Sequence, residues 1–85
     1  MHEFSVALEI CRIAEEQVGW DALPRVKEVA VEVGDDAGIE VGNLEFCLEA
    51  LLSHPPFVDA RPLIFREAGD DLRVRYLDVD DRRPT

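Results

Sequence analysis

The chain has 85 residues, of which 47% are hydrophobic and 33% are charged, and its 19 acidic and nine basic residues give a formal net charge of −10. This length and hydrophobicity are enough for one buried core, so we expect a single domain over residues 1–85. The negative charge argues against nucleic acid and anionic membrane surfaces as partners, and no apolar run approaches the roughly 18 residues of a membrane span.

A helix is the first predicted element, over residues 4–19. Its apolar residues recur at three- and four-residue steps, which is typical of one helical face. The face expected to enter the core consists of Phe4, Ala7, Leu8, Cys11, Ala14 and Val18. A second apolar stripe, formed by Val6, Ile10 and Ile13, could pack under a sheet edge or form a self-association surface. Gly19 is expected to end the helix.

After a connection that ends at Pro24, a strand is predicted over residues 25–33, because β-branched apolar residues alternate there with charged ones. Residues 34–42 are rich in glycine and acidic residues and are expected to form a solvated turn, since their spacing does not match a calcium-binding EF-hand loop. Asn43 is the expected N-cap of a second helix, which should end at His54 and the two prolines after it.

The remaining strands are predicted over residues 61–68 and 72–79, joined by a tight turn at 69–71 that is typical of an antiparallel hairpin. The order is therefore α-β-α-β-β. The first strand, second helix and second strand should form a right-handed crossover. This order predicts an α+β fold with two helices packed on one face of a small three-stranded mixed sheet.

The chain has two cysteines, Cys11 and Cys47, both within predicted helices. We interpret them as buried thiols of a protein in the reducing cytoplasm, with a disulfide between facing helices as the alternative. No basic, apolar leader precedes the first helix, which fits a cytoplasmic protein. His54 is expected to interact with the helix end as a surface residue and not as a metal ligand.

No enzyme site is evident in the sequence. The glycines of residues 34–42 are not followed by the Lys-Ser or Lys-Thr of a phosphate-binding loop. Nothing completes a catalytic triad with Ser5. No sequence motif assigns the role of general acid to one carboxylate and of general base to another. The chain has no CxxC motif of the kind that binds structural zinc. We therefore expect a protein that is not an enzyme.

The first residues, Met1-His2-Glu3, offer a different chemistry. The α-amine of Met1, the amide nitrogen of His2 and its imidazole Nδ1 can close fused chelate rings on one metal ion. Planar nitrogen donors favour Ni(II) or Cu(II). The backbone amide of Glu3, its carboxylate or an outside ligand could fill the fourth position. We expect Met1 to be retained, because a bulky His2 should impede its removal.

Several segments resemble the HypA/HybF family of nickel-delivery accessory proteins for [NiFe]-hydrogenase and, in some bacteria, urease. The resemblance begins with Met1-His2-Glu3-Phe4-Ser5. It continues through residues 25–34, 38–46, 59–65 and 72–79. It therefore covers most of the chain, and it implies transient Ni(II) binding at Met1, His2 and Glu3, with Glu40 near the metal. It also implies protein partners, namely a maturation GTPase and the large subunit of a nickel enzyme.

One departure from that family is large. The family carries a zinc-binding module with two CxxC motifs between its last two strands, whereas this chain joins the corresponding strands directly, so the insert is absent between residues 68 and 72. Cys11 and Cys47 match none of the zinc ligands. We expect no structural zinc.

Two functions of different classes follow. In the first, the chain is a metallochaperone that binds Ni(II) at its N-terminus and hands it to a partner by ligand exchange. In the second, it is a metal-independent acidic interaction or adaptor protein that kept the fold and lost nickel delivery. The stripe of Val6, Ile10 and Ile13 would then carry the contact, and a homodimer is one form that this contact could take.

Overall fold

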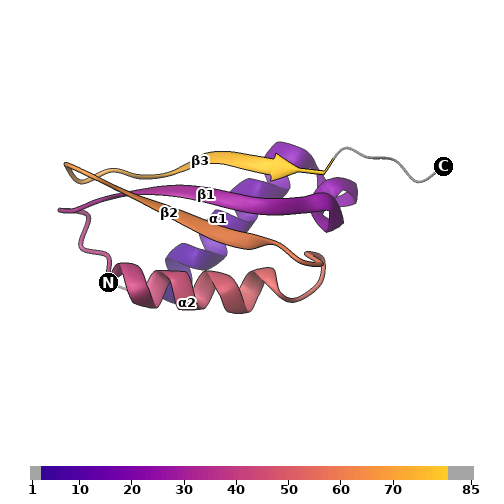
Figure 1. The fold of residues 1–85 in the computed structure, drawn as a ribbon, viewed down its shortest axis with the longest axis horizontal. Coiled ribbons are helices and arrows are strands. Elements are labelled where there is room, and N and C mark those ends of the chain that lie inside the picture. The colour runs from indigo at the N-terminus through magenta and orange to yellow at the C-terminus, as the bar shows by residue number, and fades with distance from the viewer. Residues whose placement is uncertain (1–2, 81–85) are drawn as a thin grey trace.

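The computed structural model describes residues 3–80 of the chain. The element order is α1-η1-β1-α2-β2-β3 (Figure 1), which confirms the predicted α+β class. The elements and their bounds are α1 (Glu3–Val18), the 3₁₀ helix η1 (Trp20–Arg25), β1 (Val26–Gly34), α2 (Val41–Leu52), β2 (Arg61–Glu67) and β3 (Leu72–Val79). The predicted connection after the first helix is thus a short 3₁₀ helix. Among the described residues, no helix has the length and hydrophobicity needed to cross a membrane.

The three strands form one mixed sheet in the order β2-β1-β3. β1 pairs with β2 in parallel, as the predicted crossover requires, and with β3 in antiparallel orientation. Alternation along β1 directs Val29, Val31 and Val33 to the face that carries both helices, where all three are buried. The opposite face carries the partly exposed Glu28 and Glu32.

The predicted hairpin between the last two strands is wrong. β2 and β3 are not neighbours but lie on either side of β1 (Figure 1), so their four-residue connection crosses the end of β1. Adjacent strands lie about 4.8 Å apart, so this crossing spans about 10 Å, which four residues can reach. Backbone hydrogen bonds fasten the connection, with Gly34 N–H donating to the Asp71 carbonyl at 2.7 Å and Asp36 N–H to the Gly69 carbonyl at 2.7 Å.

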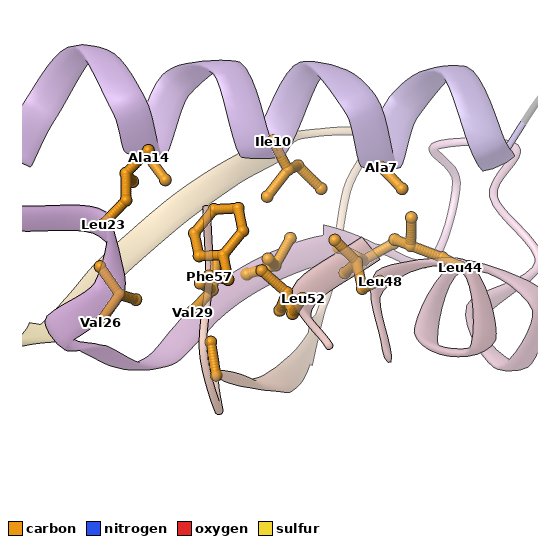
Figure 2. Close-up of a cluster of buried hydrophobic side chains, with 13 residues drawn as sticks. Ala7, Ile10, Ala14, Leu23, Val26, Val29, Leu44, Leu48, Leu52 and Phe57 are labelled. Atoms are coloured by element: carbon orange, nitrogen blue, oxygen red, sulfur yellow. The ribbon is translucent and has the colours of Figure 1, made fainter. Parts of the chain in front are cut away.

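The core lies between the two helices and the inner face of β1 (Figure 2). From α1, the residues that enter it are Ala7, Ile10 and Ala14, whereas Phe4 and Leu8 are 54% and 47% exposed. The predicted core face is therefore partly wrong, because α1 is rotated toward its second apolar stripe. That rotation lets one helix cover both the sheet and α2, and the small side chains of Ala7 and Ala14 permit close approach.

The second helix begins three residues earlier than predicted. Its N-cap is Glu40 and not Asn43: the Glu40 side chain accepts a hydrogen bond from the Asn43 N–H at 2.9 Å. The buried face of α2 consists of Leu44, Leu48 and Leu52, spaced four residues apart as a helix requires. At its other end, the Nδ1 of His54 lies 2.7 Å from the Ala50 carbonyl, the helix-end contact expected of this histidine.

Candidate functional site

Of the residues predicted to bind metal, Met1 and His2 lie outside the described residues. Glu3 is the first residue of α1, and its side chain is buried, with 8% of the residue exposed. The backbone N–H groups of a helix's first turn have no acceptor within the helix. The backbone nitrogen of Glu3 is therefore not required for the hydrogen bonding of α1.

The carboxylate of Glu3 is held by the start of α2. Its Oε2 accepts a hydrogen bond from the backbone N–H of Glu40 at 3.1 Å, and its Oε1 accepts one from the Asn43 side-chain amide at 3.0 Å. These contacts join residues 37 and 40 positions apart in the chain. We call the set of Glu3, Glu40 and Asn43 the N-terminal anchor. It fixes the point at which the chain enters the fold.

Electrostatics favour a negative charge at this position. The Glu3 carboxylate lies at the N-terminal ends of both α1 and α2, where unpaired N–H groups and the helix dipoles attract anions. The hydrogen bond from the Glu40 N–H, followed by that from Asn43, lowers the pKa of Glu3 from its ordinary value. Glu3 is therefore ionised at neutral pH, and it adds a negative charge to a corner of the molecule that can attract a cation.

Glu40, the residue expected near the metal, does lie beside Glu3. The structure gives it a definite local role, since its backbone donates to Glu3 while its carboxylate caps α2. Asn43 is a site residue whose role the sequence reading missed, because its side chain was assigned to capping and in fact binds Glu3. The spacing of Glu40 and Asn43 matches an N-cap and its N3 residue and could have indicated the true helix start.

No second candidate metal centre is formed by residues 3–80. Within that range, no group of three or more histidine, cysteine, aspartate or glutamate side chains could hold an ion. Cys11 and Cys47 are free and partly buried, so the alternative of a disulfide is wrong for this structure. Burial raises the pKa of the Cys11 thiol to about 11. This thiol is protonated at neutral pH and is a poor metal ligand there.

The fold and the anchor together define a small α+β protein in which Glu3, the first residue of α1, is hydrogen-bonded to the start of α2. A comparison with known protein families identifies a match: residues 1–78 match the family described as "Hydrogenase/urease nickel incorporation, metallochaperone, hypA". The chain belongs to this family. A metallochaperone is a carrier, which agrees with the prediction that the chain is not an enzyme.

The individual relatives that match this chain are named hydrogenase maturation factor HypA. The chain is 45% identical over 51 residues to the hydrogenase maturation factor HypA of Azotobacter chroococcum, covering 60% of this chain and 45% of the relative. It is 35% identical over 69 residues to the corresponding factor of Geobacter metallireducens, covering 81% of this chain and 60% of the relative. It is 34% identical over 61 residues to the hydrogenase maturation factor HypA of Parabacteroides distasonis, covering 72% of this chain and 53% of the relative. The chain thus spans about half the length of these relatives.

Proposed function

We propose that this chain is a nickel carrier that binds Ni(II) at Met1, His2 and Glu3 and transfers it during maturation of a nickel enzyme. The observation that carries the proposal is the N-terminal anchor, together with membership of a nickel-incorporation family. The buried, ionised side chain of Glu3 fixes the first residue of α1 to the start of α2. We expect a helix start to be fixed in this way where the residues immediately before it have a function.

The anchor also refines the proposed ligand set. Both oxygens of the Glu3 carboxylate already accept hydrogen bonds, so this group is better suited to positioning than to ligation. We assign the fourth donor to the backbone nitrogen of Glu3, beside the α-amine of Met1 and the two nitrogens of His2. Four nitrogens in a plane suit square-planar Ni(II). Glu40 acts behind the ligands, by holding Glu3.

Release of the ion would follow from the same chemistry. Amine, imidazole and amide nitrogens must lose protons to bind nickel, so acid weakens binding and an incoming ligand can displace the donors one by one. We propose that the acceptor is the large subunit of a nickel enzyme, reached with a maturation GTPase in the cytoplasm. The carrier would act without structural zinc, as one domain whose last two strands are joined by residues 68–71.

Titration with Ni(II) tests the proposal, using untagged protein with a free Met1. His2→Ala and a variant with an N-terminal extension remove the donors, while His54→Ala is a matched control because it deletes the other histidine. We expect one equivalent to bind with a square-planar absorption spectrum, unchanged in His54→Ala and lost in the other two variants. Equal binding in all four proteins, or none in any, would refute the N-terminal site and favour the metal-independent adaptor.

A further inference from the structure

Asn43 is the one side chain that holds Glu3 in the described part of the chain. Its Nδ2 donates a hydrogen bond to Oε1 of Glu3 at 3.0 Å, across 40 positions of the sequence. The other donor to this carboxylate is the backbone N–H of Glu40, which bonds to Oε2 at 3.1 Å. Any residue except proline would supply that backbone N–H. The amide of Asn43 is therefore the part of the hold on Glu3 that depends on the identity of a side chain.

The two hydrogen bonds fix the Glu3 side chain at both of its oxygens. A carboxylate held at one oxygen can still turn, whereas one held at both oxygens is fixed in plane and direction. The side chain is also shielded from solvent, since only 8% of the residue is exposed. The side chain and the backbone nitrogen of Glu3 share one Cα. A fixed carboxylate therefore limits how far that nitrogen can move.

Local helix preferences do not explain an asparagine at this position. Asn43 is the third residue of α2, and its side chain is not the cap, because the Glu40 carboxylate accepts from the Asn43 N–H at 2.9 Å. Asparagine forms helices less well than alanine, because its side chain competes for nearby backbone groups. Here the amide binds a residue of the other helix instead. Residues that run against local preference are expected at sites that serve a function.

The backbone nitrogen of Glu3 is the group that this contact can serve. It is the proposed fourth donor to Ni(II), and it lies in the first turn of α1, where N–H groups have no acceptor within the helix. When the ion binds, this nitrogen loses its proton to water and forms a bond to the metal. A nitrogen that is already held in place loses less freedom in that step, so the bound ion is released more slowly.

We propose that Asn43 is a positioning residue for nickel, which holds Glu3 so that its backbone nitrogen stays in the plane of the other three donors and slows release of the ion. The proposal rests on the proposed nickel site at Met1, His2 and Glu3. Asn43 donates to the carboxylate and not to the backbone nitrogen, so it acts through the side chain of Glu3.

Three substitutions separate this role from a general effect on folding. Asn43→Ala removes the donor, and Asn43→Gln keeps a side-chain amide on a stem that is one methylene longer. Asn43→Asp keeps the shape but places a negative charge beside Glu3. An acidic residue in the first turn of a helix favours that helix, so α2 should tolerate this change while the contact with Glu3 is lost. Gln17→Ala is the matched control, because it removes the chain's other side-chain amide, which is exposed near the end of α1.

Release of Ni(II) from the loaded, untagged protein to excess EDTA is the measurement, followed by the decay of the square-planar absorption band. We expect release from Asn43→Ala to be on the order of fivefold to tenfold faster, the factor that one such hydrogen bond contributes. Asn43→Asp should be faster still, Asn43→Gln slower than Asn43→Ala, and Gln17→Ala equal to the parent. Circular dichroism of the nickel bands reports the geometry of the chelate rings. It should change in Asn43→Ala and Asn43→Asp, although the far-ultraviolet spectrum shows both to be folded.

A metal-free readout keeps this inference separate from the proposed nickel site. Backbone NMR relaxation without metal should show Glu3 as ordered as the middle of α1 in the parent and more mobile in Asn43→Ala. If the parent binds nickel but release and dichroism are unchanged in Asn43→Ala and Asn43→Asp, the inference is overturned and the proposed function stands. Equal acceleration in Gln17→Ala would overturn it as well. Absence of nickel binding in the parent and in every variant would instead refute the proposed function, and the inference with it.

Discussion

Substituting Gly34 with alanine should be among the most destabilising small changes in this chain. A Cβ built on Gly34 would lie 2.3 Å from the carbonyl oxygen of Gly69, 2.7 Å from its carbonyl carbon and 2.9 Å from the nitrogen of Asp70. All three are backbone atoms, so no side chain can turn aside to make room. The β2–β3 connection itself would have to move away from the end of β1.

The magnitude follows from two effects. Overpacking against a constrained neighbour costs about 1–3 kcal/mol. Moving the connection also weakens at least one of its backbone hydrogen bonds to Gly34 and Asp36, each contributing about 1 kcal/mol. We therefore expect Gly34→Ala to lower the free energy of unfolding by about 2–4 kcal/mol. For a domain of this size, the Tm should fall by roughly 10–30 °C.

Gly42→Ala is the matched control. It adds the same methyl group in the first turn of α2, where the nearest atoms are side-chain oxygens of Glu40 at 3.4 and 3.5 Å. Alanine favours a helix over glycine, so stability should be unchanged or rise by up to about 1 kcal/mol. Urea denaturation measures both variants. A Gly34→Ala protein within about 0.5 kcal/mol of the parent, or two variants of equal stability, would refute this reasoning.

Three further predictions concern the core, the thiol and the anchor. Leu48→Ala should lower the free energy of unfolding by about 2–5 kcal/mol in urea, while Phe46→Ala, on the exposed side of the same helix, should change it by less than about 0.5 kcal/mol. Because its pKa is about 11, Cys11 should react slowly with a thiol reagent at pH 8 in the folded protein and fast after unfolding. The lowered pKa of Glu3 means that its contribution to stability is present above its ordinary value of 4.5 and is lost as the pH falls through the lowered value. Acid unfolding of Glu3→Gln should lack this part of the pH dependence, and an identical acid profile would show that the anchor does not form.

The order and type of the elements were predictable because local patterns encode them. Alternating β-branched residues define β1, and the leucines of α2 recur at helical spacing. The position of β3 was not predictable in this way. A short, glycine-containing connection is typical of a hairpin, and nothing local shows that it crosses the end of β1. Only the absence of a side chain at Gly34, opposite a segment 35 positions later, permits that path.

The core face of α1 illustrates the same limit. Its two apolar stripes are similar in hydrophobicity, so the sequence cannot rank them without the neighbouring elements. In the folded chain Ile10 is buried at 3% exposure while Leu8 is at 47%, because the sheet and α2 lie on the side of Ile10. Glu3 and Glu40, both named from the sequence as candidate site residues, contact each other in the structure, whereas Met1 and His2 lie outside the described residues. The contact between Glu3 and Glu40 was not predicted, because a hydrogen bond across 37 residues leaves no local pattern.

The segment between β1 and α2 links the two features in which this chain is most distinctive. At one end Asp36 donates to Gly69 in the short connection, and at the other end Glu40 donates to Glu3 in the N-terminal anchor. Both features therefore lie at the same end of the molecule, where β1 ends and α2 begins (Figure 1). The four-residue connection closes the sheet beside Gly34, whereas the anchor depends on the N-terminal ends of α1 and α2, which the connection does not supply. The hydrogen bonds that hold Glu3 are therefore made without any residue of the connection between β2 and β3.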